Sequence, residues 1–323
     1  MRAGGPRLSR LLAAGVGIVM TSTGLACSSA TSGSPGTAAG PQGSAAASHP
    51  PQRTVEMLGS RWAEVWTDAF NGPAGQGVSP ANWKYNTGQN VFGTGEVETM
   101  TDSPANVRLD GHGNLDIIPL SNGSSWTSGR IETTSNQFAA PPGGQMMVTA
   151  SIKQPNPANG VGYWPGFWLV APGSWPAHGE IDILENINAY SDLAGTMHCG
   201  NMTQRNSDGT TGPCHESTGL SSGLRPCPGC QTGYHAYSLV IDRRNAADEQ
   251  VRWYIDGQQY YSVSESTVGA AAWTEAIDHG FSIILDVAMG GGFPNVKCQC
   301  TSPLAQTSSG AAMGVGSVSV YTN

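Results

Sequence analysis

Short apolar segments bounded by turn residues recur along most of this chain, and they limit what it can fold into. About a dozen of them alternate in polarity as β-strands do, and each lies between Gly, Pro, Asn or Asp turns. The predicted strands are 63–70, 107–109, 114–119, 129–133, 145–153, 166–170, 180–186, 194–198, 235–242, 251–255, 259–263, 281–287 and 314–321. Asp256-Gly257 predicts a tight hairpin, and Glu265 to Ile277 is the one helical candidate. The pattern predicts an all-β fold, a jelly-roll sandwich of two curved antiparallel sheets.

One predicted strand concentrates acidic residues. Segment 178–186 contains Glu180, Asp182 and Glu185, although only 12% of the chain is charged. Strict alternation places Glu180 and Asp182 on one face of the strand and Glu185 on the other. One extra residue bulged out near positions 183 and 184 would restore the parity, and all three carboxylates would then share a face.

Three carboxylates on one face indicate acid–base chemistry. With the bulge, the carboxyl groups of Glu180 and Glu185 come near the roughly 5 to 5.5 Å separation of retaining glycosidases. Asp182 between them would hydrogen-bond the nucleophile and raise the pKa of its neighbour by like-charge repulsion. Two other interpretations remain open at this point: a solvated acidic strand face, and a calcium site built from the same oxygens.

The N-terminal residues have the pattern of an export signal. Three arginines within the first ten residues precede the apolar run Leu11 to Met20, which is too short to span a bilayer as a helix. Gly24-Leu25-Ala26-Cys27 resembles a bacterial lipoprotein box, with Gly24 where Leu, Val or Ile is usual. We therefore expect residues 1–27 to be a signal peptide, and the mature protein to be secreted or a bacterial cell-surface lipoprotein anchored at Cys27.

Composition divides the remaining chain into two parts. Residues 28–56 are rich in Ser, Gly, Ala and Pro and predict a disordered linker. Residues 57–323 are dense in Trp, Gly and alternating apolar positions, show no internal repeat, and predict one domain with a single core.

The charge of the folded part excludes several partners. All 23 acidic residues lie from Glu56 onward, whereas four of the 15 basic residues precede it, so 11 basic and 23 acidic groups leave a net charge of −12 on residues 54–323. Such a surface repels nucleic acid, anionic membranes and sulfated polysaccharides. We expect a monomer that binds a neutral ligand and touches a membrane only through a lipid at Cys27.

Six cysteines remain after Cys27, an even number in a chain expected to be exported. Cys199 with Cys214 is the first expected disulfide, and Cys227-Pro-Gly-Cys230 could close a tight turn by itself. The alternative is a four-cysteine zinc site, made by Cys227, Cys230, Cys298 and Cys300.

Aromatic residues cluster just before the acidic strand. Trp164 and Trp168 flank Phe167, which we expect in the core, and Trp175 lies in a Gly/Pro loop where we expect exposure. Flat aromatic faces stack on the apolar faces of sugar rings, so they can bind neutral carbohydrate without charge.

Three motifs together resemble glycoside hydrolase family 16, in its laminarinase-like branch. They are Trp164-Pro-Gly-Phe-Trp168, the segment from Trp175 through His178-Gly-Glu180-Ile-Asp182-Ile-Leu-Glu185, and Gly195-Thr-Met-His198. Weaker similarities, among them Gly95-Glu96-Val-Glu98 and Trp126-Thr-Ser-Gly129-Arg130, extend the resemblance over residues 62–321.

The resemblance implies a concave substrate cleft and endo-acting hydrolysis that retains the anomeric configuration. It implies Glu180 as nucleophile, Glu185 as general acid/base and Asp182 as the carboxylate that positions the nucleophile. The implied substrate-binding residues are the stacking aromatics Trp164, Trp168 and Trp175 and the cleft-lining Arg130, Glu96 and His198. A purely structural histidine is the alternative for His198.

The resemblance also bears on the substrate. The bulged motif, with Leu184 as its extra residue, favours a β-1,3 linkage. Laminarin-type glucan is the expected polymer, while the cysteine loops keep an endo-β-1,3-galactanase open, and a non-catalytic glucan-binding protein is the other alternative. No cofactor is expected, and a structural calcium is doubtful because Gly316 stands where many members have Asp. Asp286 adds an acid to which no role can be assigned.

Overall fold

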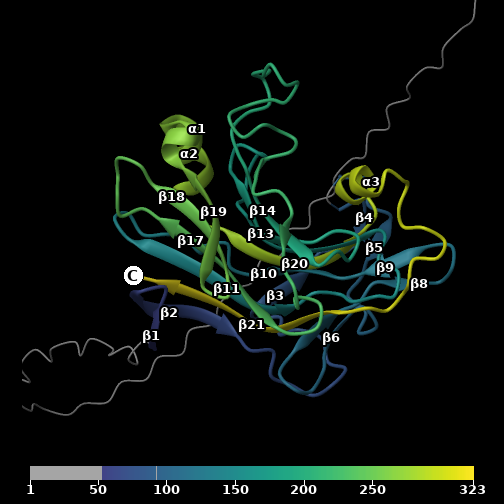
Figure 1. Cartoon of the computed structure of the whole chain (residues 1–323). Coiled ribbons are helices and arrows are strands. Elements are labelled where there is room, and N and C mark those ends of the chain that lie inside the picture. The colour runs from purple at the N-terminus through teal and green to yellow at the C-terminus, as the bar shows by residue number, and fades with distance from the viewer. Residues whose placement is uncertain (1–52, 92) are drawn as a thin grey trace, which may run out of the picture. The chain divides into compact units, whose positions relative to one another are not determined.

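Two large antiparallel sheets carry most of the chain that the computed structural model describes, residues 53–91 and 93–323. Figure 1 shows them layered against each other. The nine-stranded sheet contains β1 (Thr54–Met57), β2 (Ser60–Asp68), β21 (Met313–Thr322), β11 (Gln145–Lys153), β17 (His235–Asp242), β18 (Gln250–Ile255) and β19 (Gln258–Ser264) in that order, with β6 (Val107–Leu109) and β7 (Leu115–Ile117) joined at β21. The predicted all-β sandwich is confirmed.

The second sheet holds the acidic strand near its middle. Its strands are, in order, β15 (Leu220–Ser221), β14 (Asp192–His198), β13 (Glu180–Glu185), β12 (Tyr163–Val170), β20 (Ser282–Met289), β10 (Arg130–Thr133) and β3 (Trp83–Tyr85), with β16 (Arg225–Pro226) paired to β14. A small third sheet contains β4 (Gly88–Gln89), β5 (Glu98–Met100), β9 (Trp126–Ser128) and β8 (Leu120–Ser121).

The inner faces of the two large sheets form one hydrophobic core. Phe167 and Leu285 from the eight-stranded sheet and Val148 and Leu239 from the nine-stranded sheet are fully buried in the same cluster. Burying each such side chain contributes about 1.5 to 3 kcal/mol of transfer free energy. The polar positions that alternate with them on the eight-stranded sheet therefore face away from the core.

The helices are few and short. The predicted helical segment forms α1 (Glu265–Val268) and α2 (Ala270–Ile277), which meet at Gly269. The sequence reasoning missed α3 (Gly292–Cys298) because its seven residues are too few to show a helical period. Figure 1 shows α1 and α2 beside the β18–β19 hairpin, and α3 near β4.

Most predicted strands match observed ones within two or three residues. The hairpin turn at Asp256-Gly257 is confirmed, since both residues have positive φ, 47° and 76°, as a two-residue turn of this type requires. Apart from β1, the strands that were not predicted, such as β4 and β15, contain only two or three residues and are too short to show alternation.

The boundary of the folded part needs a correction. Residues 54–56, which the composition assigned to the linker, belong to β1, which pairs with β2 from Thr54 opposite Ala63 to Met57 opposite Ser60. Composition alone cannot reveal this strand, because the apolar side chain that it covers, Trp62, lies on another strand and bonds Met57 through its indole N–H. The expected signal peptide 1–27 and most of the linker lie outside the described residues.

The described cysteines pair within short sequence distances. Cys199–Cys214 forms as expected, and Cys227–Cys230 closes its own turn. Cys298 pairs with Cys300, so the zinc alternative, which needed four free thiolates, is wrong. None of the helices in the described ranges has the length and apolar character to cross a bilayer.

Candidate active site

A β-bulge in β13 decides where its acids point. Against β12, Leu184 lies opposite Phe167 but Asp182 lies opposite Trp168, so one residue of β13 has no partner. Ile183 and Leu184 are consecutive and both are buried in the hydrophobic core. The bulge therefore forms where the sequence requires it, and it returns Glu185 to the face that carries Glu180 and Asp182.

Side chains from the opposite sheet stabilise this bulge. A bulge removes backbone groups from the ladder, and here the Trp253 indole N–H donates to the Asp182 carbonyl at 2.7 Å, while the Tyr260 hydroxyl lies 3.4 Å from the Ile183 carbonyl. Gly195, across the bulge on β14, makes room for them, since a Cβ there would lie 2.5 Å from the Trp253 ring and 2.8 Å from the Tyr260 hydroxyl.

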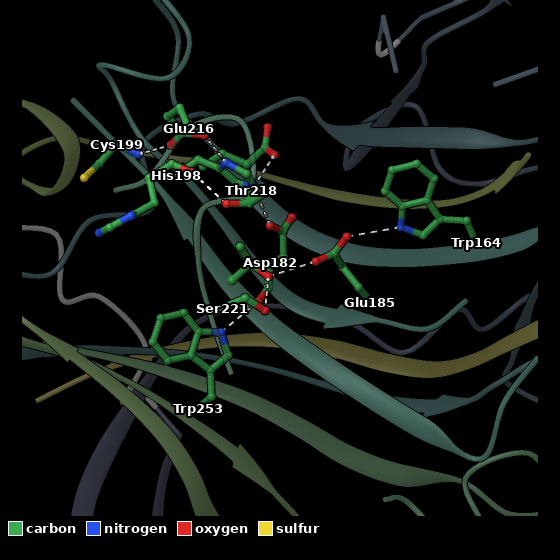
Figure 2. A network of polar contacts seen from close by, with 12 residues as sticks. Trp164, Asp182, Glu185, His198, Cys199, Glu216, Thr218, Ser221 and Trp253 are labelled. Carbon is green, nitrogen blue, oxygen red and sulfur yellow. Dashed lines mark hydrogen bonds and ion pairs between the residues drawn. The ribbon is translucent and has the colours of Figure 1, made fainter. Parts of the chain in front are cut away.

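Glu185 accepts hydrogen bonds on both carboxyl oxygens. The Trp164 indole N–H donates to Oε1 at 3.1 Å, and the Thr196 hydroxyl donates to Oε2 at 2.9 Å. Figure 2 shows Asp182, Glu185 and Trp164 gathered on one side of β13, with Trp253 on the other. Because both donors are neutral, Glu185 is oriented without an ion-pair partner among these contacts.

His198 lies beside the other two carboxylates. Its Nε2 is 3.9 Å from Glu180 Oε1 and 3.6 Å from Asp182 Oδ2. Asp182 Oδ2 is buried and accepts no hydrogen bond from the described residues. An imidazole N–H at Nε2 would thus face two acceptors, one of which is otherwise unsatisfied.

Burial controls the electrostatics of this acidic group. Desolvation raises the pKa of Glu180, and His198 gives the largest opposing effect. Desolvation raises the pKa of Asp182 well above its usual range, and the charges of Glu185 and Glu180 add to it. Desolvation also raises the pKa of Glu185, against the effects of the His198 charge and its two hydrogen bonds. Carboxyl groups held in this way can carry protons near neutral pH, as a general acid must.

Arg130, Trp168 and Asp286 form a second layer beside the acidic strand. The Arg130 guanidinium lies over the Trp168 ring, 4.9 Å from its centroid, and the Trp168 N–H donates to Asp286 Oδ1 at 2.7 Å. Burial raises the pKa of Asp286 to about 7, against the effects of the Trp168 hydrogen bond and Arg130. Trp168 is only 9% exposed, so little of its ring is available to stack on a sugar, which was its expected role.

The remaining predicted residues extend the site in two directions. Trp175 is 46% exposed, and its ring centroid lies 5.5 Å from that of His198. At the other end, Trp164 packs edge-on against Phe293 of α3, with centroids 6.0 Å apart. The Glu96 backbone and the Trp164 ring both approach Gly291. All nine predicted site residues therefore belong to one connected region.

Among the described residues, one cluster has His, Asp and Glu ligand atoms within 4.8 Å of one another, and it consists of Glu180, Asp182 and His198. The same spacing suits an imidazole N–H directed at two carboxylates. These groups belong to the acid–base arrangement described above.

Three residues that bond predicted site residues were not themselves predicted as part of the site: Thr196, Asp286 and Glu216. Thr196 lies inside a recognised motif, so its place two residues before His198 could have revealed it. Asp286 was noticed as an extra acid without a role. Glu216 had no signal, because it lies in a polar loop, and only the fold places its carboxylate against His198.

Comparison with known proteins agrees with this geometry. A family model described as the XgeA-like, catalytic GH16 domain matches residues 123–234. The crystal structure of an endo-1,3-β-glucanase from Streptomyces sioyaensis is 41% identical in sequence and covers 81% of this chain and 96% of its own, with a TM-score of 0.74. The chain belongs to glycoside hydrolase family 16. Its catalytic class is therefore hydrolysis of glycosidic bonds.

More distant matches include a solved structure with the same fold and a relative found by sequence. An endo-β-1,3-glucanase from Pyrococcus furiosus is 27% identical and covers 84% of this chain and 98% of its own, with a TM-score of 0.64. The glucan endo-1,3-β-glucosidase A1 of Niallia circulans is 28% identical over 284 residues. That match covers 80% of this chain but only 37% of the relative's length.

Proposed function

We propose that this family 16 member is a retaining endo-β-1,3-glucanase that acts on neutral, laminarin-type glucan. The observation that carries the proposal is the bulge in β13, since it presents two glutamates and an aspartate on one face, between Trp164 and Trp175. Two carboxylates with an aromatic approach are what a double displacement at a sugar requires.

The contacts support distinct roles for the two glutamates. Glu180 faces His198, whose positive charge favours the ionised carboxylate needed for attack on the anomeric carbon. Glu185, with its raised pKa, donates its proton to the glycosidic oxygen as that bond breaks. The resulting glycosyl ester on Glu180 is then hydrolysed by a water that gives its proton to Glu185.

The β-1,3 linkage rests on two further points. The bulged motif with Leu184 is the form that we associate with the β-1,3-acting branch. The relatives from Streptomyces sioyaensis and Pyrococcus furiosus are both endo-1,3-β-glucanases by name. The net negative charge of the folded part favours a neutral polymer.

A product profile tests this proposal. Purified protein is incubated with laminarin, mixed-linkage glucan, β-1,3-galactan and agarose, and released reducing ends and the anomer first formed are followed. We expect oligosaccharides from laminarin with retained configuration. Turnover of galactan alone would identify a galactanase, and binding without new reducing ends would identify a carbohydrate-binding protein; either result would overturn the glucanase proposal.

We further propose that the protein is exported and that Cys27 is its lipidation site. The N-terminal arginines followed by an apolar run, and the disulfides among the described residues, support this proposal. Expression in bacteria with labelled palmitate should label the wild type but not Cys27→Ser. An unlabelled wild type found in the medium would support secretion without an anchor.

We also propose that turnover needs no metal ion, because the double displacement uses two carboxylates and water alone. Incubation with excess EDTA should leave laminarin hydrolysis unchanged. If dialysis against EDTA abolished activity and calcium restored it, this proposal would be wrong, and a structural calcium would have to be sought despite Gly316.

A further inference from the structure

Glu216 is buried within an otherwise exposed stretch of loop. Its neighbours His215 and Ser217 are exposed, whereas Glu216 is 3% exposed and its side chain is completely buried. Carboxylates are rarely buried without a specific partner, because removing the charge from water is costly. The position of this side chain therefore needs an explanation beyond loop packing.

The loop that carries Glu216 is held in place by a disulfide and by hydrogen bonds. It runs from the end of β14 to β15 and is closed by the Cys199–Cys214 disulfide. The Glu216 backbone exchanges two hydrogen bonds with Thr211, and one carboxyl oxygen, Oε1, accepts the Cys199 N–H at 3.0 Å. The loop thus holds this carboxylate in one place.

The other carboxyl oxygen holds the imidazole of His198. Glu216 Oε2 lies 2.7 Å from His198 Nδ1, and Figure 2 shows this contact. Gly219 lies against the same ring, where a Cβ would approach His198 Cε1 to 2.9 Å, and its φ of +68° also favours glycine. With Nδ1 donating to Glu216, the opposite nitrogen, Nε2, is directed at Glu180 and Asp182.

We propose that Glu216 is a positioning residue of the reaction, which from its disulfide-closed loop holds the His198 imidazole with Nε2 directed at the nucleophile Glu180 and at Asp182. The inference rests on the proposed function and deepens it. Among the described residues, the Glu216 carboxylate bonds His198 and the Cys199 N–H but neither glutamate of the double displacement, so it acts on the chemistry chiefly through His198.

The charged groups around His198 determine the direction of its pKa shift and, through it, affect the pKa of Glu180. The charged or titratable groups facing the imidazole are Glu180, Asp182 and Glu185 from β13 and Glu216 from the loop. The charge of Arg130 on β10 lowers the pKa of Glu180. Burial would lower the pKa of His198, but the hydrogen bond and charge of Glu216 and the charges of Glu180 and Glu185 outweigh it and raise the pKa. The imidazolium in turn lowers the pKa of Glu180, and so offsets part of the rise that burial causes.

A simpler role for Glu216 would be to anchor the loop through the Cys199 N–H. Glu216→Gln separates the two roles, because a glutamine oxygen still accepts that N–H bond but carries no charge for the imidazole. Asp208→Asn in the same loop is the matched control. Asp208 is exposed, and its partners among the described residues are His215 and Thr210 of the same loop.

The kinetic test compares wild type, Glu216→Gln and Asp208→Asn on the substrate that the wild type hydrolyses. Loss of the Glu216 charge removes a direct effect that raises the pKa of Glu180, but it also lowers the pKa of His198. Because the His198 charge has the larger effect on Glu180, the pKa of Glu180 should rise on balance. For Glu216→Gln we expect kcat to fall about tenfold with KM within about twofold, and the acidic limb of kcat/KM to move up by roughly one pH unit. A profile of Glu216→Gln that superimposes on those of wild type and Asp208→Asn would overturn the proposal.

Titration of the His198 ring by ¹⁵N NMR needs no turnover and tests the same arrangement. In the wild type, Nδ1 should keep its proton, and the pKa should lie above that of an exposed histidine. A wild-type His198 that titrates lower, or that lacks the Nδ1 proton, would refute the role of Glu216 even if Glu216→Gln failed to fold. A protein with the expected titration that hydrolyses no glycan would refute the proposed function and leave the positioning intact.

Discussion

Asp242 and the three acids of β13 are largely removed from solvent, and they are compensated in opposite ways. On the nine-stranded sheet, Asp242 accepts hydrogen bonds from Arg244, Arg252 and Gln145. On the eight-stranded sheet, Glu180 and Asp182 lie beside the His198 imidazole, and Glu185 accepts hydrogen bonds from two neutral donors. Both carboxyl oxygens of Asp242 therefore accept strong hydrogen bonds, whereas Asp182 Oδ2 is buried and accepts none from the described residues.

The electrostatic outcome follows from these partners. Burial would raise the pKa of Asp242, but the hydrogen bonds from Arg244 and the charge of Arg252 outweigh it and lower the pKa to about 2. In the acidic strand burial prevails, and the pKa of each carboxyl is raised. A carboxylate paired with arginine stabilises the fold, whereas incompletely paired carboxylates are those available for proton transfer and nucleophilic attack.

The largest expected effect is on turnover. Glu180→Gln removes the attacking oxygen while preserving size, so the rate of laminarin hydrolysis should fall by at least about 10³-fold without loss of thermal stability. Asp242→Asn, at an acid of the other sheet that is also largely shielded from solvent, should retain wild-type turnover after correction for folded protein. Comparable activity losses in the two variants would remove the distinction between the groups, and an active Glu180→Gln would refute the assigned nucleophile.

The second effect is on stability. Asp242→Asn leaves two arginines without their carboxylate, and we expect a loss of about 2 kcal/mol in the free energy of unfolding at pH 7. Because the folded-state pKa of Asp242 is depressed to about 2, its stabilisation is complete above the unfolded-state pKa near 4 and is lost as the pH falls toward 2. Urea unfolding at pH 7 and pH 2.5 should therefore give a smaller difference between variant and wild type at the lower pH. An equal difference at both pH values would contradict this account.

Glu98 gives a further test of this comparison, because its pKa is shifted in the opposite direction to that of Asp242. Glu98 is 1% exposed, and burial, with the charges of Glu96 and Asp286, raises its pKa to about 8. Because the folded-state pKa of Glu98 is raised, its contribution to the stability of the fold is fully present below the unfolded-state pKa. That contribution is lost as the pH rises through the folded-state pKa of about 8. Glu98→Gln mimics the protonated acid and can still accept the Met289 N–H.

We therefore expect Glu98→Gln to raise stability by about 1 kcal/mol at pH 8 and to change it little at pH 4. Thermal unfolding at the two pH values measures the difference. A loss of stability at pH 8 would show that the ionised form of Glu98 is paired in the folded protein.

The smallest effect concerns the neutral donors of Glu185. Thr196→Val removes the hydrogen bond to Oε2, which favours the ionised form, so the pKa of Glu185 should rise. Since Glu185 must be protonated to act as general acid, the basic limb of kcat/KM should move up by about half a pH unit. Thr149→Val is the control, because Thr149 pairs with Ser238 on the nine-stranded sheet. A shift in the control, or none in Thr196→Val, would contradict this assignment.

The carboxyl groups of β13 were predictable because their chemistry is local. Alternation along one strand shows that Glu185 needs a bulge to join Glu180, and the apolar residues at 183 and 184 are what such a bulge buries. The aromatic residues of β12 and the loop before β13 were predictable for the same reason, since they precede the acids directly. The roles of Trp168 and Asp286 were not, because their contact depends on how β12 and β20 align.

The sequence by itself determined the all-β class, the position of the bulge and the acidic face, because each depends on side-chain periodicity. It suggested two of the disulfide pairings from short separations along the chain but left a zinc site open as the alternative for four of the cysteines. Only the tertiary structure decided which groups surround those acids. Trp253 reaches the bulge from the other sheet, and Glu216 reaches His198 from a disulfide-closed loop. Contacts across sheets and loops leave no periodic trace in a sequence, yet they control the orientation and charge of the site.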